Sequence, residues 1–240
     1  MNNILTEICE NKKKEIELAK KKCSFASLEK IFHDKTNRNF KKLLTNSQKE
    51  KKNNIIAEIK KASPSAGLII KDYFPENIAI DYEKSGAGSI SILTETSFFQ
   101  GNLDHLSLIN KKSNLPILRK DFIIDAYQIL ESKIYKADAI LLIVSILSDN
   151  QLKEFIDIAD KYGLDCIVET YNQTELERAL KIGYPIIGIN NRNLKNLSID
   201  INNTINLIKN IPNEFIVVAE SGIKTKKNIN IYNKLGVYNF

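Results

Sequence analysis

Residues 55–68 of the chain read IIAEIKKASPSAGL. The stretch begins as an apolar run typical of a buried strand, acquires Glu58 and Lys60, and then breaks at Pro64 and Gly67. Because side chains alternate along a strand, Glu58 and Lys60 share one face and lie about 7 Å apart along it. Opposite charges at the end of a buried strand either form an ion pair with each other or face a ligand.

Short apolar runs of this kind recur along the chain, each ending in a polar residue or a loop. The expected strands are Ile55–Ile59, Ser89–Leu93, Pro116–Leu118, Ala139–Val144, Cys166–Val168, Ile186–Ile189 and Phe215–Ala219. They are apolar on both faces, which is typical of a parallel sheet covered by helices. Between them, helical periodicity predicts helices over Gln151–Tyr162 and Thr174–Ile182, with Gly163 and Gly183 at the C-cap positions.

Alternating strands and helices with no linker between them predict an α/β fold, a TIM (β/α)8 barrel, which typically has about 250 residues. A doubly wound open sheet is the alternative, but no Gly-rich dinucleotide-binding turn follows an early strand. Residues 1–50 contain no strand signal, and we expect them to form an N-terminal helical extension that acts as a lid. Residues 51–240 are expected to form the barrel.

The end of the chain differs from a complete barrel. Residues 236–240 read GVYNF, which resembles the opening of an eighth strand. We therefore expect strand eight and the last helix to be largely missing and the barrel to be incomplete at its C-terminus. Strands one and seven would then have unpaired edges, which are an aggregation hazard.

Composition bounds the function. The chain has 240 residues and a formal net charge of +6, but its lysine runs, such as Lys12-Lys13-Lys14, lack interleaved aromatic residues and are expected to be a solvated surface. We expect no nucleic-acid partner and no membrane partner, since the longest apolar run is Ala139–Val144. The N-terminus lacks the apolar core of a secretory signal, and the spacing of the three cysteines suits neither a disulfide nor a metal. These features favour a cytoplasmic protein without a metal.

Polar side chains follow five of the expected strands, at the ends where a barrel of this type places its site. They are Glu58 and Lys60, Lys120, Glu169, Asn190 with Arg192, and Glu220 with Ser221 and Gly222. Counting by twos along each strand predicts that one axial pocket receives Glu58, Lys60, Lys120, Glu169, Asn190 and Glu220. So many charges would be costly as buried structural groups, which favours a catalytic site.

The same residues carry a family resemblance. The motifs are IAEIKKASPSAG (56–67), SILTETSFFQGNLDHL (91–106), LRKDFIIDAYQILES (118–132), ADAILLIVSIL (137–147), VET (168–170), IIGINNRNL (186–194) and VVAESGIKT (217–225). In this order and spacing they closely resemble the indole-3-glycerol phosphate synthase family of tryptophan biosynthesis. That family converts 1-(2-carboxyphenylamino)-1-deoxyribulose 5-phosphate to indole-3-glycerol phosphate, CO2 and water, without a cofactor.

The resemblance implies roles for individual residues. Lys120 matches the acid of ring closure and Glu169 the base of dehydration, with Glu58 close by to orient or assist. Lys60 would hold one anionic group of the substrate, and the division of acid roles between the two lysines stays open. Asn190 would hydrogen-bond the substrate, and Glu220 and Ser221 would complete the polar floor of the site. Ser63 lies in a loop expected to fold over the substrate, Arg192 would steady the rim, and Gly222 belongs to the loop that binds the phosphate.

The resemblance also implies a partner and leaves alternatives. Phosphoribosylanthranilate isomerase would be fused to this enzyme or associated with it. Because family members continue from strand eight into a Gly-rich phosphate loop, one alternative is an inactive truncated barrel or a non-catalytic relic of the same family. Another makes Lys120 or Lys60 the Schiff-base lysine of an aldolase-type barrel.

Overall fold

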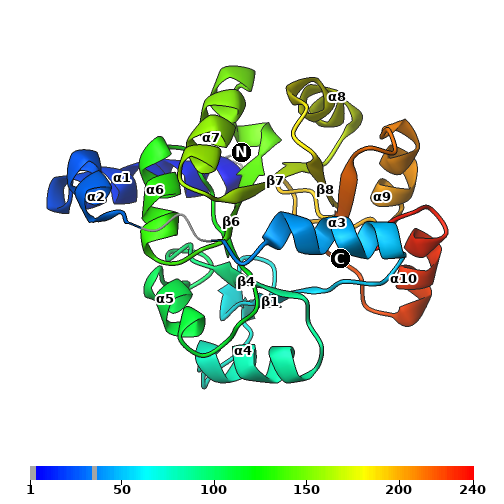
Figure 1. Cartoon of the computed structure of the whole chain (residues 1–240), viewed down its shortest axis with the longest axis horizontal. Helices are drawn as coiled ribbons and strands as arrows, with labels where there is room; N and C mark the ends of the chain where they lie inside the picture. Colours follow the sequence, from blue (N-terminus) through cyan, green and yellow to red (C-terminus); the bar gives the residue numbers. More distant parts are fainter. Residues whose placement is uncertain (1–3, 34–36) are drawn as a thin grey trace.

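The computed structural model describes residues 4–33 and 37–240 (Figure 1). Its main sheet is curled and parallel, with the strand order β1-β4-β5-β6-β7-β8-β9. The strands are β1 (Ile56–Ile59), β4 (Ser89–Leu93), β5 (Ile117–Lys120), β6 (Ala139–Ile143), β7 (Asp165–Thr170), β8 (Ile186–Asn190) and β9 (Ile216–Glu220). All seven expected strands are confirmed, with ends displaced by no more than two residues.

A helix follows each strand of this sheet, and together the helices surround it (Figure 1). They are α4 (Pro75–Lys84), α5 (Asp104–Asn110), α6 (Ala126–Ile134), α7 (Asp149–Lys161), α8 (Gln173–Ile182), α9 (Asn202–Leu207) and α10 (Lys226–Asn233), with short 3-10 turns at Val144–Ile146 and Ile208–Asn210. Local sequence sets their ends. The Ser148 side chain accepts a hydrogen bond from the Gln151 amide at the start of α7, and Gly183 ends α8 at a φ of 81°.

Alternation along each strand divides the apolar residues between two cores. Ile140 and Leu142 of β6 face the surrounding helices, whereas Leu141 and Ile143 face the interior of the curled sheet. Every residue of β6 is therefore buried. This is the reason that the strands lack polar alternation in the sequence.

Residues 238–240 occupy the place between β1 and β9. Asn239 forms parallel bridges with both Asn54 and Val218, and the Ala219 amide donates to the Asn239 carbonyl at 3.0 Å. The Ile56 amide donates to the Phe240 carbonyl at 2.7 Å. The prediction that strand eight is missing and leaves two unpaired edges is therefore wrong, because three residues are enough to bridge both edges.

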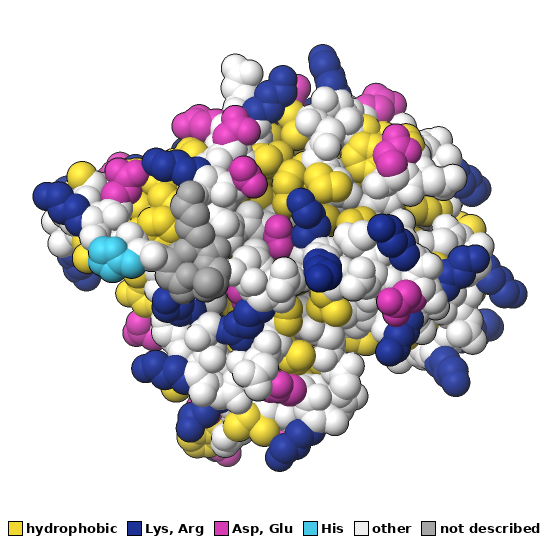
Figure 2. Space-filling model, viewed as in Figure 1, with side chains coloured by type: hydrophobic (Ala, Val, Ile, Leu, Met, Phe, Trp, Pro, Cys, Tyr) yellow, Lys and Arg dark blue, Asp and Glu magenta, His cyan; other side chains and the backbone are white. Residues whose placement is uncertain are grey.

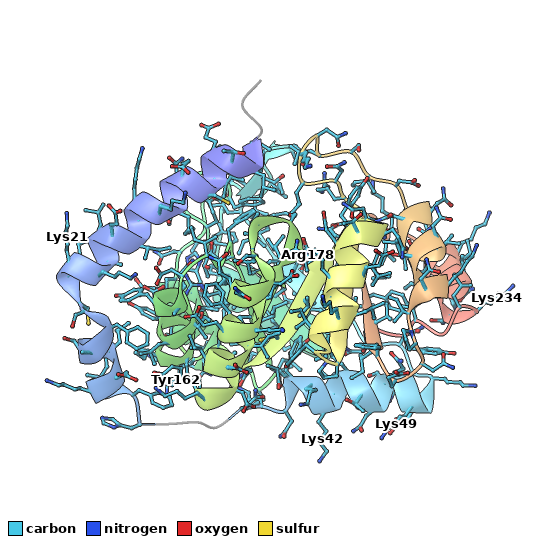
Figure 3. The ribbon with its side chains drawn as sticks, turned by 90° about the horizontal axis from the view of Figure 1, so that it is seen from above. Lys21, Lys42, Lys49, Tyr162, Arg178 and Lys234 are labelled. Carbon is cyan, nitrogen blue, oxygen red and sulfur yellow. The ribbon has the colours of Figure 1, made fainter. Side chains whose placement is uncertain are left out.

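Within residues 4–33 and 37–55, three helices precede β1: α1 (Ile4–Lys22), α2 (Phe25–Ile31) and α3 (Phe40–Glu50). Figure 3 shows α1 and α3 at opposite ends of the molecule. Phe40 and Leu44 of α3 are fully buried against the interior core, and the Gln48 amide donates to the Phe215 carbonyl where β9 begins. The prediction that the N-terminal extension acts as a lid is wrong for α3, which covers the end of the sheet where the strands start.

The SPSAG segment is more ordered than the expected loop. β2 (Ala62–Ser63) and β3 (Gly67–Leu68) pair antiparallel as a small hairpin, and Gly67 turns the chain at a φ of 65°. In the part of the chain that the structure describes, every helix is too short or too polar to cross a membrane. Figure 2 shows Lys and Arg side chains scattered over the face viewed there and not gathered into a stripe.

Candidate active site

A cavity of about 420 Å³ opens at the carboxyl ends of the strands. Nine of the ten side chains or backbone positions expected at the site line it: Glu58, Lys60, Lys120, Glu169, Asn190, Arg192, Glu220, Ser221 and Gly222. The strand registers explain this convergence, since Glu169 pairs with Gly188 and Asn190 pairs with Glu220 on the neighbouring strand. Residues in register on a curled parallel sheet point to the same interior.

The charged groups form one connected network. The Lys120 Nζ lies 3.0 Å from Glu220 Oε2 and 3.6 Å from Glu58 Oε2. Lys60 donates to Glu58 Oε1 from the same strand end. Glu58 and Lys60 thus form an ion pair with each other and also line the cavity.

This network sets the charge of Lys120. Burial would by itself lower the pKa of the ammonium, but the carboxylates of Glu220, Glu58 and Glu169 together raise that pKa above its ordinary value. Burial would likewise raise the pKa of Glu58, yet the neighbouring Lys120 and Lys60 lower it. In the free protein Lys120 is therefore an ammonium and Glu58 a carboxylate at neutral pH.

Glu169 and Glu220 form a pair of carboxyl groups deep in the cavity. Burial, followed by the nearby Glu220, raises the pKa of Glu169 well above its ordinary value, while Lys120 and Asn190 oppose the shift. Glu220 is 8% exposed, and among the described residues its Oε1 has no hydrogen-bond partner. Glu169 can therefore keep its proton at a higher pH than an exposed glutamate, and Glu220 Oε1 is left to accept a hydrogen bond from a ligand.

Gly188 makes room for this pair. A Cβ at Gly188 would lie 2.3 Å from Glu220 Oε1 and 2.8 Å from Ile167 Cγ2, both far closer than van der Waals contact. A side chain at this position would clash with the buried Ile167 and would force the Glu220 carboxylate to move, so the glycine serves packing and not a turn. The sequence analysis assigned no role to Gly188.

We expect Gly188→Ala to reduce kcat/KM by about tenfold or more, because the new methyl group displaces the Glu220 carboxylate from Lys120. Overpacking a core of this kind also costs about 1–3 kcal/mol of stability. Gly86→Ala is the matched control, since a Cβ there meets nothing within 4 Å and only the φ of 86° is strained. Steady-state kinetics and thermal melts of both variants test this, and equal kcat/KM values for the two would contradict it.

An aromatic wall completes one side of the cavity. Phe99 follows β4 and Phe122 follows β5, and their ring centroids are 6.2 Å apart. The buried Glu95 carboxylate accepts hydrogen bonds from the amides of Ser97, Phe98 and Phe99, which fixes the loop that carries Phe99. The sequence carries a signal for this wall, because Phe99 and Phe122 each follow the end of a strand, but the sequence analysis assigned neither residue a role.

Ser63 is the expected site residue that lies elsewhere. It lines a small adjoining cavity of about 60 Å³, which also borders Lys60 and Arg192. The Ser63 hydroxyl accepts a hydrogen bond from the Ala66 amide at 3.2 Å, so it stabilises the hairpin turn. Arg192 donates to the Leu197 carbonyl at 2.8 Å and borders both cavities.

The loop after β9 brings Ser221 and Gly222 to the cavity, with φ angles of 67° and 75°. A Cβ at Gly222 would lie 2.6 Å from Ile199 Cγ2, so both the backbone and the contact require glycine. Asn191, fully buried, holds this loop by donating to the Ser221 carbonyl at 3.0 Å. Sequence reasoning singled out Asn190 and missed its neighbour.

Comparison with known proteins shows which family the chain resembles. The family model described as indole-3-glycerol phosphate synthase matches residues 5–240. A protein of that name from Thermoanaerobacter pseudethanolicus is 49% identical over 98% of this chain and 88% of its own length. Those from Endomicrobium trichonymphae and Legionella pneumophila are 47% and 44% identical, covering 95% and 100% of this chain and 88% and 92% of their own.

Solved structures support the fold alone. The structure of 3-hexulose-6-phosphate synthase from Salmonella typhimurium superposes with a TM-score of 0.60 at 12% identity, covering 78% of this chain and 86% of that one. KGPDC from Streptococcus mutans gives 0.57 at 13% identity, with the same coverage of each chain. The family assignment therefore rests on the sequence match over residues 5–240 and on the whole-length relatives. The chain belongs to the indole-3-glycerol phosphate synthase family.

Proposed function

We propose that this cavity closes the indole ring: it converts 1-(2-carboxyphenylamino)-1-deoxyribulose 5-phosphate to indole-3-glycerol phosphate, CO2 and water. The protein is a carboxy-lyase of tryptophan biosynthesis. The observation that carries the proposal is the meeting of Lys60, Lys120 and Glu169 in one cavity beside an aromatic wall. The reaction needs an acid, a base and a surface that binds a flat anionic ring, and these groups supply all three.

Lys120 acts as the acid of ring closure. The ring carbon that bears the carboxylate attacks the ketone carbon, and Lys120 protonates the ketone oxygen as negative charge builds on it. A positioned acid is worth about 10²–10⁴ in rate. The pKa of Lys120 is raised by Glu220, Glu58 and Glu169 against the effect of burial, so the amine regains its proton readily after each transfer. Loss of CO2 then restores the electron pair to the ring.

Glu169 acts as the base of dehydration. Removing a proton from the new ring allows the hydroxyl group to leave as water once an acid has protonated it. Lys60, paired with Glu58, is placed to hold the substrate carboxylate and to supply that proton. Asn190 forms hydrogen bonds with the substrate chain, and Glu220 Oε1, which has no partner among residues 4–33 and 37–240, accepts one from it. Ser221, Gly222 and Arg192 border the end of the cavity suited to the phosphate, with Ser63 shaping the hairpin above it.

The remaining parts of the proposal concern the wider chain. The bridges of Asn239 to both sheet edges support a closed (β/α)8 barrel formed by residues 51–240. Residues 1–50 are the N-terminal extension, whose helices α1 and α3 contribute Leu5, Ile8, Phe40 and Leu44 to the interior core. We propose a cytoplasmic location and the small phosphorylated substrate named above. Fusion to or association with phosphoribosylanthranilate isomerase belongs to the same proposal.

Turnover by the chain as given tests the proposal. We expect the purified 240-residue protein to convert the anilino-deoxyribulose phosphate to a product with indole fluorescence, against a low background because the chain has no Trp. Mass spectrometry should show the loss of one CO2 and one water from the substrate. A cooperatively folded protein that binds the substrate but forms no product would favour the non-catalytic relic and overturn the proposal.

A further inference from the structure

Helix α1 presents a charge in the middle of its buried stripe. The buried residues of α1 are Leu5, Ile8, Lys12 and Ile16, which share one face of the helix. The Lys12 side chain is only 5% exposed, whereas Lys13 beside it is 61% exposed. The prediction that Lys12-Lys13-Lys14 is a solvated run is therefore wrong for Lys12, whose neighbours in space explain its burial.

The ammonium of Lys12 lies at the end of β5, against the carboxylate of Asp121. It is 3.1 Å from Asp121 Oδ1 and 2.6 Å from Glu15 Oε2. Asp121 Oδ1 also accepts a hydrogen bond from the Phe122 amide at 2.8 Å, and Arg119 and Thr94 bind its other oxygen. Lys12 thus contacts the carboxylate that orients the start of the Phe122 loop.

Glu15 connects the same helix to the neighbouring loop. The Thr96 hydroxyl donates to Glu15 Oε1, and Thr96 directly follows Glu95, whose carboxylate holds the Phe99 amide. The pair Lys12–Glu15 therefore joins α1 to the loops after β4 and β5 at once. These are the loops that carry Phe99 and Phe122 into the cavity.

Apolar contacts of α1 lie on the same two rings. Leu5 and Ile8 border the small adjoining cavity together with Phe99 and Phe122. An apolar stripe alone would bury α1 without specifying its position along the loops. A buried ion pair is a poor source of stability but can fix one arrangement, since its hydrogen bonds are directional. Although burial would raise the pKa of Asp121, Lys12 and then Arg119 lower it to about 2, so the pair stays ionised.

We propose that Lys12 is a positioning residue for the aromatic half of the substrate. Through Asp121 on one side and Glu15 with Thr96 on the other, it holds the Phe99 and Phe122 loops at the separation that accepts a flat ring. Lys12 does not touch the reacting atoms. The inference rests on the proposed function and adds a determinant of binding specificity that lies outside the cavity.

Lys12→Met tests this in the full chain, with Lys13→Met as the matched control on the exposed side of the same helix. We expect Lys12→Met to raise KM and the inhibition constant of indole-3-glycerol phosphate by about tenfold. A displacement of the positioning groups by about 1 Å can lower activity by up to about 10²-fold, so a smaller shift of the two loops accounts for a tenfold effect. We expect kcat to fall by less than about threefold, since Lys120 and Glu169 stay in place. Inhibition by ribose 5-phosphate, which has no aromatic ring, should be unchanged.

Further variants separate positioning from general destabilisation. Lys12→Arg should restore most of the lost affinity, and Glu15→Gln should raise KM in the same direction with a smaller effect. Lys12→Met and Asp121→Asn should be non-additive in KM, since both break one pair. The inference is overturned if Lys12→Met and Lys13→Met have equal KM values, or if both inhibitors weaken equally. If the wild-type chain has no turnover, the proposed function itself is overturned. If the wild type turns over but Lys12→Met behaves like Lys13→Met, only the positioning role of Lys12 is overturned.

Discussion

Lys120→Met is expected to lower kcat by about 10²–10⁴ while the protein still binds product. The variant keeps the length of the side chain but removes the proton donor, and general-acid catalysis is worth about that factor. Binding should change less than turnover, because Lys60 remains to meet the substrate carboxylate. Single-turnover kinetics together with product-binding titrations separate the two effects.

A second substitution at Lys120 separates the loss of the acid from a loss of folding stability. Removing Lys120 leaves Glu58 and Glu220 without a shared partner, so Lys120→Met also loses some stability. Lys120→Arg keeps the positive charge but holds its proton too tightly to act as an acid, so we expect a folded protein with similarly low kcat. Lys112→Met, on an exposed residue before β5, is the matched control. Full activity in either Lys120 variant would refute the assigned acid.

The same residue decides between the lyase and an aldolase-type mechanism. A Schiff base requires a neutral amine, whereas the three carboxylates around Lys120 raise its pKa and keep it charged despite burial. Borohydride added during turnover should therefore leave the mass of the protein unchanged. A covalent adduct on Lys120 or Lys60 would favour the aldolase alternative.

Glu169→Gln is expected to reduce kcat by about 10²–10⁴ as well, because the amide cannot remove a proton in the dehydration step. The wild-type pH dependence gives an independent signature. Burial and Glu220 raise the pKa of Glu169, so the base is protonated in acid and kcat/KM should rise with pH through a limb that lies well above pH 4.5. An ordinary Glu would titrate near pH 4.3.

Profiles of kcat/KM against pH for wild type, Glu169→Gln and the exposed control Glu177→Gln test this assignment. The acid limb should be displaced or lost in Glu169→Gln and unchanged in Glu177→Gln. Because the neighbouring Glu220 raises the pKa of Glu169, the position of the limb depends on both residues. A wild-type limb near pH 4, or an unaltered limb in Glu169→Gln, would show that another group is the base.

Most of the fold could be read from the chain because burial on both faces leaves a strong local signal. The strands of the curled sheet are uninterrupted apolar runs such as Ala139–Ile143, and the capping residues of α7 and α8 are local in sequence. The prediction that strand eight is missing was wrong because Asn239 is bridged to Asn54 and Val218, and no local sequence pattern reveals these partners. Likewise, the family prediction from motifs is confirmed by the match over residues 5–240.

The candidate site divides in the same way. Glu58, Lys60, Lys120, Glu169 and Glu220 could be found because each ends an apolar run and alternation along a strand gives its face. Their roles stay predictions until the variants are measured. Gly188 and Lys12 could not be found, because their importance comes from what approaches them in space and not from their sequence neighbours.

The sequence by itself determined which segments become strands, toward which face of the sheet the polar residue at each strand end points, and which family the chain belongs to. Tertiary structure alone decided which carboxylates share Lys120, why Gly188 must lack a side chain, and that a lysine of the first helix lies against the end of β5. The physical reason is one of range. Alternation and capping act over a few residues, whereas desolvation and Coulomb interactions depend on distances that only folding sets.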